Sequence, residues 1–363
     1  MRRPRVLVAG PSRRAAGGVA AVLETLIGSG LADRFELVHV VTHRDAGGVG
    51  KAVQALTGFA RASLLLATRQ VDVVYVLTSS GFSLRRKAVV AALARLVRRP
   101  YVVHVHASDF DGYYREATAW EQLLVRKTLS GAALVIAVSP AWERRLRALS
   151  PCRTTAIPNP VSIPAEAARL DASPPRIVSL GRLGVRKGSG TIVRALALLG
   201  ERHPDARLVL AGDGDVASVQ DEARRLGVGD RVDLPGWIGA EERARTLRTA
   251  SVFALPSRAE GLPVALLEAM AYGLPAVVSP VGGIPDAFEE GRHGYFVQPD
   301  DPDALADRLG SILDDPEKAR TMGMQARADA MARYESEVVA AQIGDALEAV
   351  LRRSERESVF PGR

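Results

Sequence analysis

Two glutamates with seven residues between them, Glu260 and Glu268, belong to the segment whose residue types point most directly to ligand chemistry. Pro263 is typical of the first turn of a helix and Gly273 of its end, so a short helix is predicted there. Nearly all its other residues are apolar or small, which predicts a buried helix. A buried carboxylate at Glu268 needs a partner, and the hydroxyls of a ligand would serve. The alternatives are an internal arginine partner and an exposed rim position.

Glu260 comes immediately before this predicted helix, beside Gly261. The N-terminus of a helix carries unpaired N–H groups and positive potential, which suits it to binding a phosphate. A carboxylate placed there can also order the hydroxyls of a sugar. The simpler alternative is that Glu260 only caps the helix dipole.

A second candidate is the loop that follows a strand predicted at residues 176–180 and precedes a helix. Between two glycines it carries Arg182, Arg186 and Lys187. A guanidinium offers a planar fork and an ammonium a point charge, and both suit a diphosphate. The spacing is not that of a Walker loop, and no Gly-x-Gly-x-x-Gly follows the first strand, which disfavours a dinucleotide-dependent dehydrogenase.

The elements that must position these residues alternate along the chain as short β-branched runs and longer segments rich in Ala, Leu and Arg. The apolar runs are continuous, as in parallel strands covered on both faces, and they predict a doubly wound α/β fold. The predicted strands are residues 6–9, 37–41, 71–77, 101–105, 133–138, 176–180, 207–211, 251–255 and 276–279; predicted helices include 19–27, 86–97 and 335–353.

The pattern pauses at residues 157–175, where five prolines fall, and this segment is interpreted as a linker. Two Rossmann-like domains are expected, one at 1–165 and one at 166–340, followed by a helical tail at 341–363 that frays from residue 354. Ligands bind beyond the carboxyl ends of parallel strands. Because glycines, cations, carboxylates and histidines gather at these ends, two sheets facing each other across a cleft would enclose a site.

Taken together, these residues resemble the retaining nucleotide-sugar glycosyltransferases of family four (group 1), which have the GT-B fold. Glu260 and Glu268 match the E-x7-E signature of that family. The resemblance covers nearly the whole chain and is densest over residues 176–301. The other matching segments are Gly17-Gly18, His106, Gly181-Arg182 with Lys187-Gly188, Gly212-Asp213-Gly214, Leu255-Pro256-Ser257, and Gly282-Gly283 followed by Pro285.

The resemblance implies that the N-terminal domain at 1–165 binds the acceptor and the C-terminal domain at 166–340 the nucleotide-sugar donor, and it implies roles for several of these residues. Arg182 and Lys187 would hold the donor diphosphate and stabilise it as the leaving group, Glu268 would bind the nucleotide ribose, and Glu260 would hold hydroxyls of the donor sugar. His106 would reach the same sugar from the N-terminal domain. The remaining implied donor contacts are Gly17, Gly18, Gly212, Gly214, Trp237, Ile238, Gly261, Leu262 and Pro263. Weaker candidates for acceptor contacts are Arg13, Asp109 and Tyr113. The final helix of such enzymes returns to the first domain.

One position departs from the family pattern, since Ala107 follows His106 where the family has glycine. His104 is a second candidate histidine, although a histidine inside a strand is more typical of the core. The implied reaction is same-face transfer, in which the leaving phosphate takes the acceptor proton. A glycoside hydrolase is disfavoured because it pairs two carboxylates across one bond, whereas Glu260 and Glu268 would address different parts of one ligand.

The expected function is transfer of a hexose-type sugar from a nucleoside diphosphate sugar, preferably UDP-linked, to a hydroxyl of a glycan, glycolipid or metabolite, as in bacterial polysaccharide biosynthesis. One alternative is a GT-B sugar phosphorylase or hexose-phosphate synthase. The last alternative is a basic nucleic-acid-binding protein. No metal and no cofactor beyond the nucleotide-sugar co-substrate are expected, because the two D-x-D triplets at 109–111 and 213–215 are common by chance.

The charge balance of the 363 residues, 48 Lys and Arg against 41 Asp and Glu, favours acidic partners such as phosphates or an anionic membrane. Basic clusters at 85–87 and 98–99 flank an apolar helix that could lie on anionic lipid, or that could simply be packed with solvated ends. Cys152 is the only cysteine, so no intrachain disulfide is expected. With no spanning segment and no signal peptide recognised, a cytoplasmic protein is predicted, peripheral to the inner membrane face at most.

Overall fold

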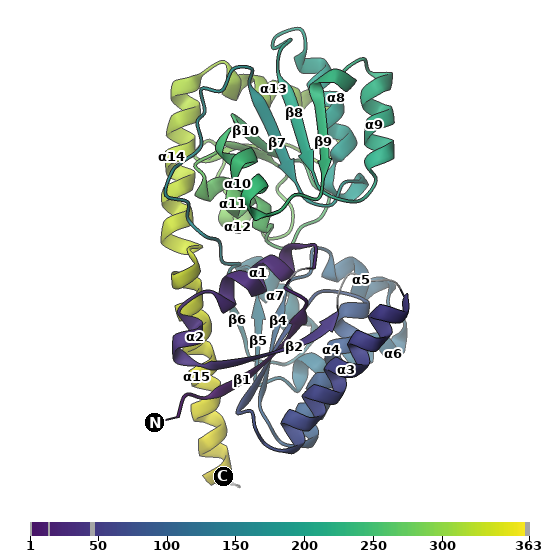
Figure 1. The fold of residues 1–363 in the computed structure, drawn as a ribbon, viewed down its shortest axis with the longest axis vertical. Helices are drawn as coiled ribbons and strands as arrows, with labels where there is room; N and C mark the ends of the chain where they lie inside the picture. Colours follow the sequence, from purple (N-terminus) through teal and green to yellow (C-terminus); the bar gives the residue numbers. More distant parts are fainter. Residues whose placement is uncertain (1, 14, 44–47, 360–363) are drawn as a thin grey trace. The chain divides into compact units, whose positions relative to one another are not determined.

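The computed structural model describes residues 2–13, 15–43 and 48–359 and divides into two compact units (Figure 1). Unit 1 comprises Met1–Pro160 and Ser336–Arg363, and unit 2 comprises Val161–Glu335. Each unit is built on a six-stranded sheet whose strand pairs are parallel. Helices connect the strands, which confirms the predicted doubly wound α/β class.

The sheet of unit 1 has the strand order β2-β1-β3-β4-β5-β6. These strands are β1 (Arg5–Pro11), β2 (Glu36–His43), β3 (Val73–Thr78), β4 (Tyr101–Val105), β5 (Leu134–Ala137) and β6 (Thr154–Ala156). Strands β3 and β4 are buried along their whole length, as their continuous apolar runs predict. The order reverses between β1 and β3, which makes the carboxyl ends there the expected place for a ligand.

The helices of unit 1 form two groups. In one group α3 (Gly48–Ala67), α4 (Phe82–Leu96) and α6 (Ala119–Ser130) pack side by side (Figure 1). In the other, α1 (Gly18–Ile27) and α2 (Leu31–Arg34) pack with α15 (Ser336–Val359). Because right-handed crossovers in opposite directions lie on opposite faces of a parallel sheet, the β1–β2 and β2–β3 connections cover different faces. The remaining helices are α5 (Phe110–Glu116) and α7 (Pro140–Leu149).

Helix α15 is tied to unit 1 by charged contacts. The Arg34 guanidinium lies 2.8 Å from Asp345 Oδ1 and 2.6 Å from Glu348 Oε1, and the Gly30 N–H donates to Glu337 Oε2 at 2.9 Å. The chain therefore returns to its first unit after leaving it at Pro160. The helix continues to Val359, so the predicted end at residue 353 is wrong by more than a turn. Residues 360–363 lie outside the described part of the chain.

The sheet of unit 2 has the strand order β12-β11-β10-β7-β8-β9. Its strands are β7 (Arg176–Leu180), β8 (Arg207–Ala211), β9 (Val232–Gly236), β10 (Val252–Leu255), β11 (Ala276–Val278) and β12 (Gly294–Phe296). Its helices are α8 (Ser189–Leu199), α9 (Val216–Arg225), α10 (Ala240–Arg248), α11 (Val264–Ala271), α12 (Ile284–Ala287), α13 (Pro302–Leu313) and α14 (Pro316–Arg333), with 3-10 turns η1 (Val185–Lys187) and η2 (Gly229–Arg231). A core of buried aliphatic side chains such as Leu196, Leu208 and Leu309 joins the sheet to α8, α9 and α13.

Local sequence signals explain where several helices begin. Asp301 and Asp315 each precede a proline, and each aspartate accepts a hydrogen bond from the N–H three residues on, at Ala304 and at Lys318. Proline fits the first turn because its missing N–H would be unpaired there anyway.

Every predicted strand is present, but β6, β9 and β12 were not predicted. Among the described helices, none is both long enough and apolar enough to cross a membrane.

Candidate active site

The cationic loop of unit 2 is held in place by backbone contacts between neighbouring strand ends. Leu183 N donates to Asp213 O at 2.6 Å, and Asp215 N donates to Leu183 O at 3.2 Å. A side chain at Gly212 would overlap the carbonyl oxygen of Gly181, and one at Gly214 would overlap that of Leu183. Gly212 and Gly214, which were expected to contact the donor, therefore also have a structural task, because they let the two loops pack closely.

Lys187 and Glu260 form a largely buried ion pair in unit 2. Lys187 Nζ lies 2.8 Å from Glu260 Oε1, and the side chains are 13% and 6% exposed. Ser257 Oγ donates to the same oxygen at 2.7 Å, and Arg186 Nη1 lies 3.7 Å away. Glu260 is thus bound by two cations and a hydroxyl. It therefore does more than cap the helix dipole, which was the simpler alternative from the sequence.

The turn at residues 282–283 packs closely against the backbone carbonyl groups of Glu260 and Gly261. Gly282 has a φ of +61°, and a side chain there would overlap the carbonyl oxygen of Glu260. Gly283 N donates to Gly261 O at 2.7 Å. The close approach requires glycine, which gives the Gly282-Gly283 pair a physical reason.

Arg182 differs from Lys187 in its surroundings. It is exposed, and within the described residues it has no ion pair with an acidic side chain. A guanidinium in this state can form a bidentate contact with a phosphate without first breaking an internal bond. The loop therefore offers two cations that already have internal partners, Arg186 and Lys187, and one available cation, Arg182.

Glu268 lies on α11, which begins at Val264 and ends at Ala271. Pro263 caps this helix from the preceding position, so the prediction that it occupies the first turn is wrong by one residue. Arg243 Nη2 lies 3.3 Å from Glu268 Oε1, which is the internal arginine partner that the sequence left open. Burial raises the pKa of Glu268, and Arg243 opposes that shift. The side chain remains 17% exposed, so a ligand hydroxyl can also reach it.

Trp237 and Ile238, two of the implied donor contacts, lie between β9 and α10. Trp237 is half exposed, whereas Ile238 is buried. An exposed indole offers a flat apolar face on which a nucleobase can stack. Leu262, another expected donor contact, is buried beside Gly261, so a role for it would have to involve its backbone.

His106 lies at the carboxyl end of β4 in unit 1, where its N–H donates to Thr78 O at 2.7 Å. Its Nδ1 is 2.9 Å from Asn159 Oδ1, while Nε2 is buried without a partner among the described residues. Burial lowers the pKa of His106 to about 4; the Asn159 bond opposes this and the charge of Lys87 adds to it. Asn159 was missed because it was interpreted only as part of a proline-rich linker.

His104 has the core position expected for it. It is fully buried, and its Nδ1 lies 2.6 Å from Tyr75 Oη. Burial holds the pKa of His104 well below its usual range. Its ring lies against that of His106, with 4.0 Å between centroids.

The other unit 1 candidates have structural partners of their own. Gly17 caps α1 with a φ of +122°, and Gly18 is the first residue of that helix. Arg13 Nη2 donates to Glu24 Oε1 at 2.6 Å. Asp109 caps α5 by accepting from Gly112 N at 2.9 Å. The Tyr113 ring meets that of Phe110 edge-on. The Tyr113 N–H donates to Asp109 O at 3.3 Å at the start of α5, so these two acceptor candidates are neighbours on one short helix, whereas Arg13 pairs with Glu24.

The D-x-D triplets have local explanations as well. Asp109 is the α5 cap, and Asp215 caps α9 by accepting from Ser218 N at 3.2 Å. Within the described ranges, no group of three or more histidine, cysteine, aspartate or glutamate side chains is placed to hold a metal ion.

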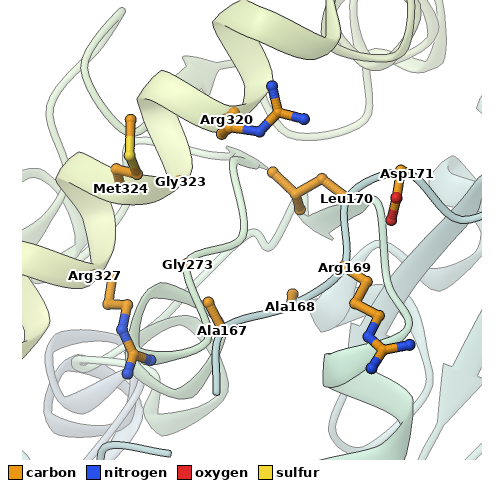
Figure 2. Close-up of a pocket in the computed structure, with 10 residues that line it drawn as sticks. All are labelled: Ala167, Ala168, Arg169, Leu170, Asp171, Gly273, Arg320, Gly323, Met324 and Arg327. Carbon is orange, nitrogen blue, oxygen red and sulfur yellow. The ribbon is translucent and has the colours of Figure 1, made fainter. Parts of the chain in front are cut away.

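A separate cavity of about 370 Å³ lies in unit 2 between the linker and α14 (Figure 2). Its lining includes Arg169, Gly273 and Arg327, and none of the predicted site residues. The Arg327 guanidinium donates to the carbonyls of Pro164 and Ala271. This arginine therefore fastens the linker to the rest of unit 2.

Two family models match the chain. The Glycosyltransferase Family 4 model matches residues 15–163, and the Glycosyl transferases group 1 model matches residues 165–329. These matches define the class of protein, a glycosyltransferase. More particularly, the chain belongs to the group 1 glycosyltransferases of family four.

Proteins with similar sequences are named as mannosyltransferases or glycosyltransferases. A GDP-mannose-dependent alpha-(1-6)-phosphatidylinositol monomannoside mannosyltransferase of Mycolicibacterium smegmatis is 35% identical over 192 residues, which is 51% of this chain and 50% of that protein. A D-inositol 3-phosphate glycosyltransferase of Streptomyces griseus is 35% identical over 178 residues, 46% of this chain and 38% of that protein. The chain therefore spans about half the length, or less, of these relatives.

Solved structures show the same fold. A sucrose-phosphate synthase from Thermosynechococcus elongatus superposes with a TM-score of 0.80 at 23% identity, covering 97% of this chain and all of that one. Anabaena HepE, in a complex with UDP and glucose, gives a TM-score of 0.77 at 21% identity over 95% of this chain and 100% of that one. The GT-B fold predicted from the sequence is thereby confirmed.

Proposed function

We propose that the chain transfers a hexose-type sugar, with retention of its anomeric configuration, from a nucleoside diphosphate sugar to a hydroxyl group of a glycan, glycolipid or metabolite. The observation that carries the proposal is the buried Lys187–Glu260 ion pair, whose lysine lies in the same loop as the exposed Arg182. Cations suit the diphosphate, and the carboxylate suits sugar hydroxyls. Membership of the family supports this class of reaction.

The proposed mechanism depends on electrostatic stabilisation of the leaving group. As the bond from the sugar carbon to the phosphate oxygen breaks, negative charge grows on that oxygen, and Arg182 and Lys187 stabilise it. The acceptor hydroxyl attacks from the same face and forms the new glycosidic bond, and its proton passes to the departing phosphate. Lys187 is already held by Glu260 at 2.8 Å, so little reorganisation is required.

For the donor nucleotide we propose UDP, with Glu268 binding the ribose and Trp237 stacking on the base. Relatives differ in this respect, since one is named as GDP-mannose-dependent and the HepE structure contains UDP. A thermal-shift panel of UDP, GDP and ADP and their sugars decides between them. The UDP series should raise the Tm most; a response to GDP or ADP compounds alone would contradict the choice of UDP, and a response to none of them would contradict the transfer proposal.

The reaction class is then tested by transfer from the responding donor, with NMR of the product to establish the anomeric configuration. We expect activity to survive a chelator, because no metal or cofactor is proposed. Cleavage that depends on added phosphate would instead indicate a sugar phosphorylase, and transfer to a sugar phosphate would indicate a hexose-phosphate synthase. Steeply salt-dependent binding to DNA or RNA would favour the nucleic-acid alternative.

For the membrane contact expected from the sequence, we propose a wider surface than the single helix between the two basic clusters. Lys87 is buried and Arg86 is half-buried, so the 85–87 cluster does not face solvent as a unit. However, eight of the thirteen exposed large apolar side chains found in the described ranges lie on three neighbouring helices. We call this surface the α3–α4–α6 face; it comprises Val53, Leu56, Leu64, Phe82, Val89, Leu96, Trp120 and Leu123.

The charges around this face favour an anionic bilayer. Phe82, Val89 and Leu96 repeat every seven residues and so share one side of α4, and Leu96 is 80% exposed. The Arg85 guanidinium lies over the rings of both Phe82 and Trp120. Further exposed cations on these helices are Arg61, Arg95, Arg126 and Lys127. Apolar and aromatic side chains mixed with cations are typical of helices that lie on anionic lipid, and a lipid-linked acceptor would suit such a location.

Flotation with vesicles tests this surface. The protein should float with phosphatidylcholine vesicles containing anionic lipid, less with phosphatidylcholine alone, and less in high salt. The double variant Phe82→Ser with Leu96→Ser should lose binding, while Leu198→Ser, which changes an exposed leucine of unit 2, should not. Equal behaviour of both variants, or a dimer in solution that dissociates in the double variant, would contradict membrane docking.

A further inference from the structure

A buried polar cluster surrounds His106 in unit 1. Strand β4 supplies His104 and leads directly to His106, and Asn159 follows β6. Helix α4 supplies Lys87, whose Nζ donates to Ser83 Oγ at 2.9 Å. Both Asn159 and Lys87 are at most 4% exposed. Neither residue was assigned a role by the sequence motifs.

The contact with Asn159 determines which nitrogen of His106 carries the proton. Asn159 Oδ1 can only accept a hydrogen bond, so His106 Nδ1, 2.9 Å away, must donate. A neutral imidazole has one N–H. The opposite nitrogen, Nε2, therefore has a free lone pair, and it is this atom that is buried without a partner in the described residues.

The charges near His106 disfavour its protonation. The titratable groups that influence its site are Lys87 on α4 and His104 on β4, and His104 in turn contacts Tyr75 on β3. Among the described residues, no carboxylate contributes to the pKa of His106 or Lys87. Burial, with Arg86 nearby, lowers the pKa of Lys87 to about 7. Even partial charge on Lys87 therefore opposes a second positive charge on the imidazole.

We propose that Asn159 and Lys87 are positioning residues that keep His106 as a neutral imidazole protonated at Nδ1, so that Nε2 accepts a hydrogen bond from a hydroxyl of the sugar substrate. The identity of that ligand rests on the proposed function, whereas the tautomer does not. A group that presents only an acceptor, such as a carbonyl oxygen or fluorine, finds no hydrogen-bond donor at this nitrogen. The site therefore selects a hydroxyl at this position of the sugar.

The tautomer is measured directly on the whole chain. Histidine labelled with 15N gives long-range 1H–15N correlations for the six histidines, and His106→Gln identifies the signal of His106. We expect Nδ1–H with an unprotonated Nε2, and no titration between pH 5 and 8. An Nε2–H tautomer, or an imidazolium at pH 7, would overturn the proposal whether or not the chain transfers sugar.

Variants separate positioning from a purely structural role. Asn159→Leu should give a mixture of tautomers, and Asn159→Asp, nearly equal in size, should keep Nδ1–H but move the titration of His106 upward by about one pH unit. Lys87→Met should also move it upward, while Arg95→Met, which removes an exposed cation from the same helix, should not. If the His106 signal of correctly folded Asn159→Asp and Lys87→Met matches wild type throughout, the positioning roles are wrong.

A substrate series tests the ligand. Replacing one sugar hydroxyl of the donor at a time by hydrogen or by fluorine should lower kcat/KM equally at the position that contacts His106, because fluorine cannot donate to Nε2. A fluoro analogue that retains activity where the deoxy analogue loses it would show that His106 donates instead. If the wild-type protein transfers no sugar from any donor, the proposed function is contradicted. The tautomer is then tested by the NMR result alone.

Discussion

Lys187 Nζ and Glu260 Oε1 lie 2.8 Å apart in unit 2, with Ser257 Oγ on the same carboxylate oxygen. This contact connects the cationic loop after β7 to the segment that precedes α11. Removing one partner of a buried pair leaves the other charge without compensation, which typically costs about 3–5 kcal/mol. Substitutions here therefore need a readout of stability as well as one of activity.

Arg182→Ala tests the leaving-group assignment most cleanly. The Arg182 side chain is exposed and makes no ion pair in the described part of the chain, so its loss should leave the Tm nearly unchanged. Turnover should fall by about a hundredfold or more, as when one preorganised donor is removed. Initial rates with the responding donor measure this. Arg194→Ala, which breaks an exposed pair with Glu222, is the control and should remain active. A wild-type rate in Arg182→Ala would show that the assignment is wrong.

Glu268 should give nucleotide binding a pH dependence. Its pKa is raised by burial, so protonation begins at a higher pH than for an ordinary glutamate. The ionised carboxylate is the better acceptor for ribose hydroxyls, and affinity should therefore fall as the pH is lowered toward and through that pKa. Calorimetry with the free nucleoside diphosphate from pH 8 downward measures this fall. Glu268→Gln should bind more weakly at pH 8 and lose the dependence; an unchanged Kd in Glu268→Ala would contradict a role in nucleotide binding.

Gly282→Ala should be strongly destabilising. The residue has a left-handed φ of +61°, and an added side chain would overlap the carbonyl oxygen of Glu260. We expect a loss of more than about 2 kcal/mol in the free energy of unfolding, together with loss of nucleotide binding. Gly239→Ala is the matched control, because Gly239 has a φ of −74° and open space around it. Similar denaturation curves for the two variants would contradict the close packing described here.

Glu121 should contribute to the acid sensitivity of unit 1. Two hydrogen bonds from Thr118, with Arg85 adding to them, lower the pKa of Glu121 to about 2 from an ordinary 4.5. Because the folded-state pKa is the lower one, the stabilisation is complete above about pH 4.5 and is lost as the pH falls toward 2. In Glu121→Gln, unfolding free energies should depend less on pH in that window than in wild type or in Glu116→Gln. Parallel curves for all three proteins would rule the contribution out.

The strands that sequence reasoning missed share a position. Strands β6, β9 and β12 each lie at the edge of a sheet, and β6 and β12 have only three residues. In β9 the exposed residues Asp233 and Pro235 alternate with half-buried ones. Edge strands are covered less completely and so lack the continuous apolar run that reveals a central parallel strand. Strands β4, β7 and β8, in contrast, have the predicted bounds.

The candidate site was predictable in its residue types but not in its pairings. The E-x7-E spacing and the basic loop identified Glu260, Glu268 and Lys187 because a charge in an apolar or glycine-rich setting is conspicuous. Nothing local connects Glu268 with Arg243, which lies on another helix and becomes its partner only through tertiary packing. Asn159 was missed for the same reason, since its partner His106 is 53 residues away in the chain.

The return of α15 to unit 1 has a consequence for how the protein is made. A ribosome releases residues in order, so the whole of unit 2 emerges before Arg34 can meet Asp345 and Glu348. Unit 2 is continuous in sequence and can complete its own core while the earlier unit still lacks its last helix. Unit 1, which is synthesised first, is therefore the last to be completed, and a released chain truncated after residue 335 should contain a folded unit 2 and a protease-sensitive unit 1.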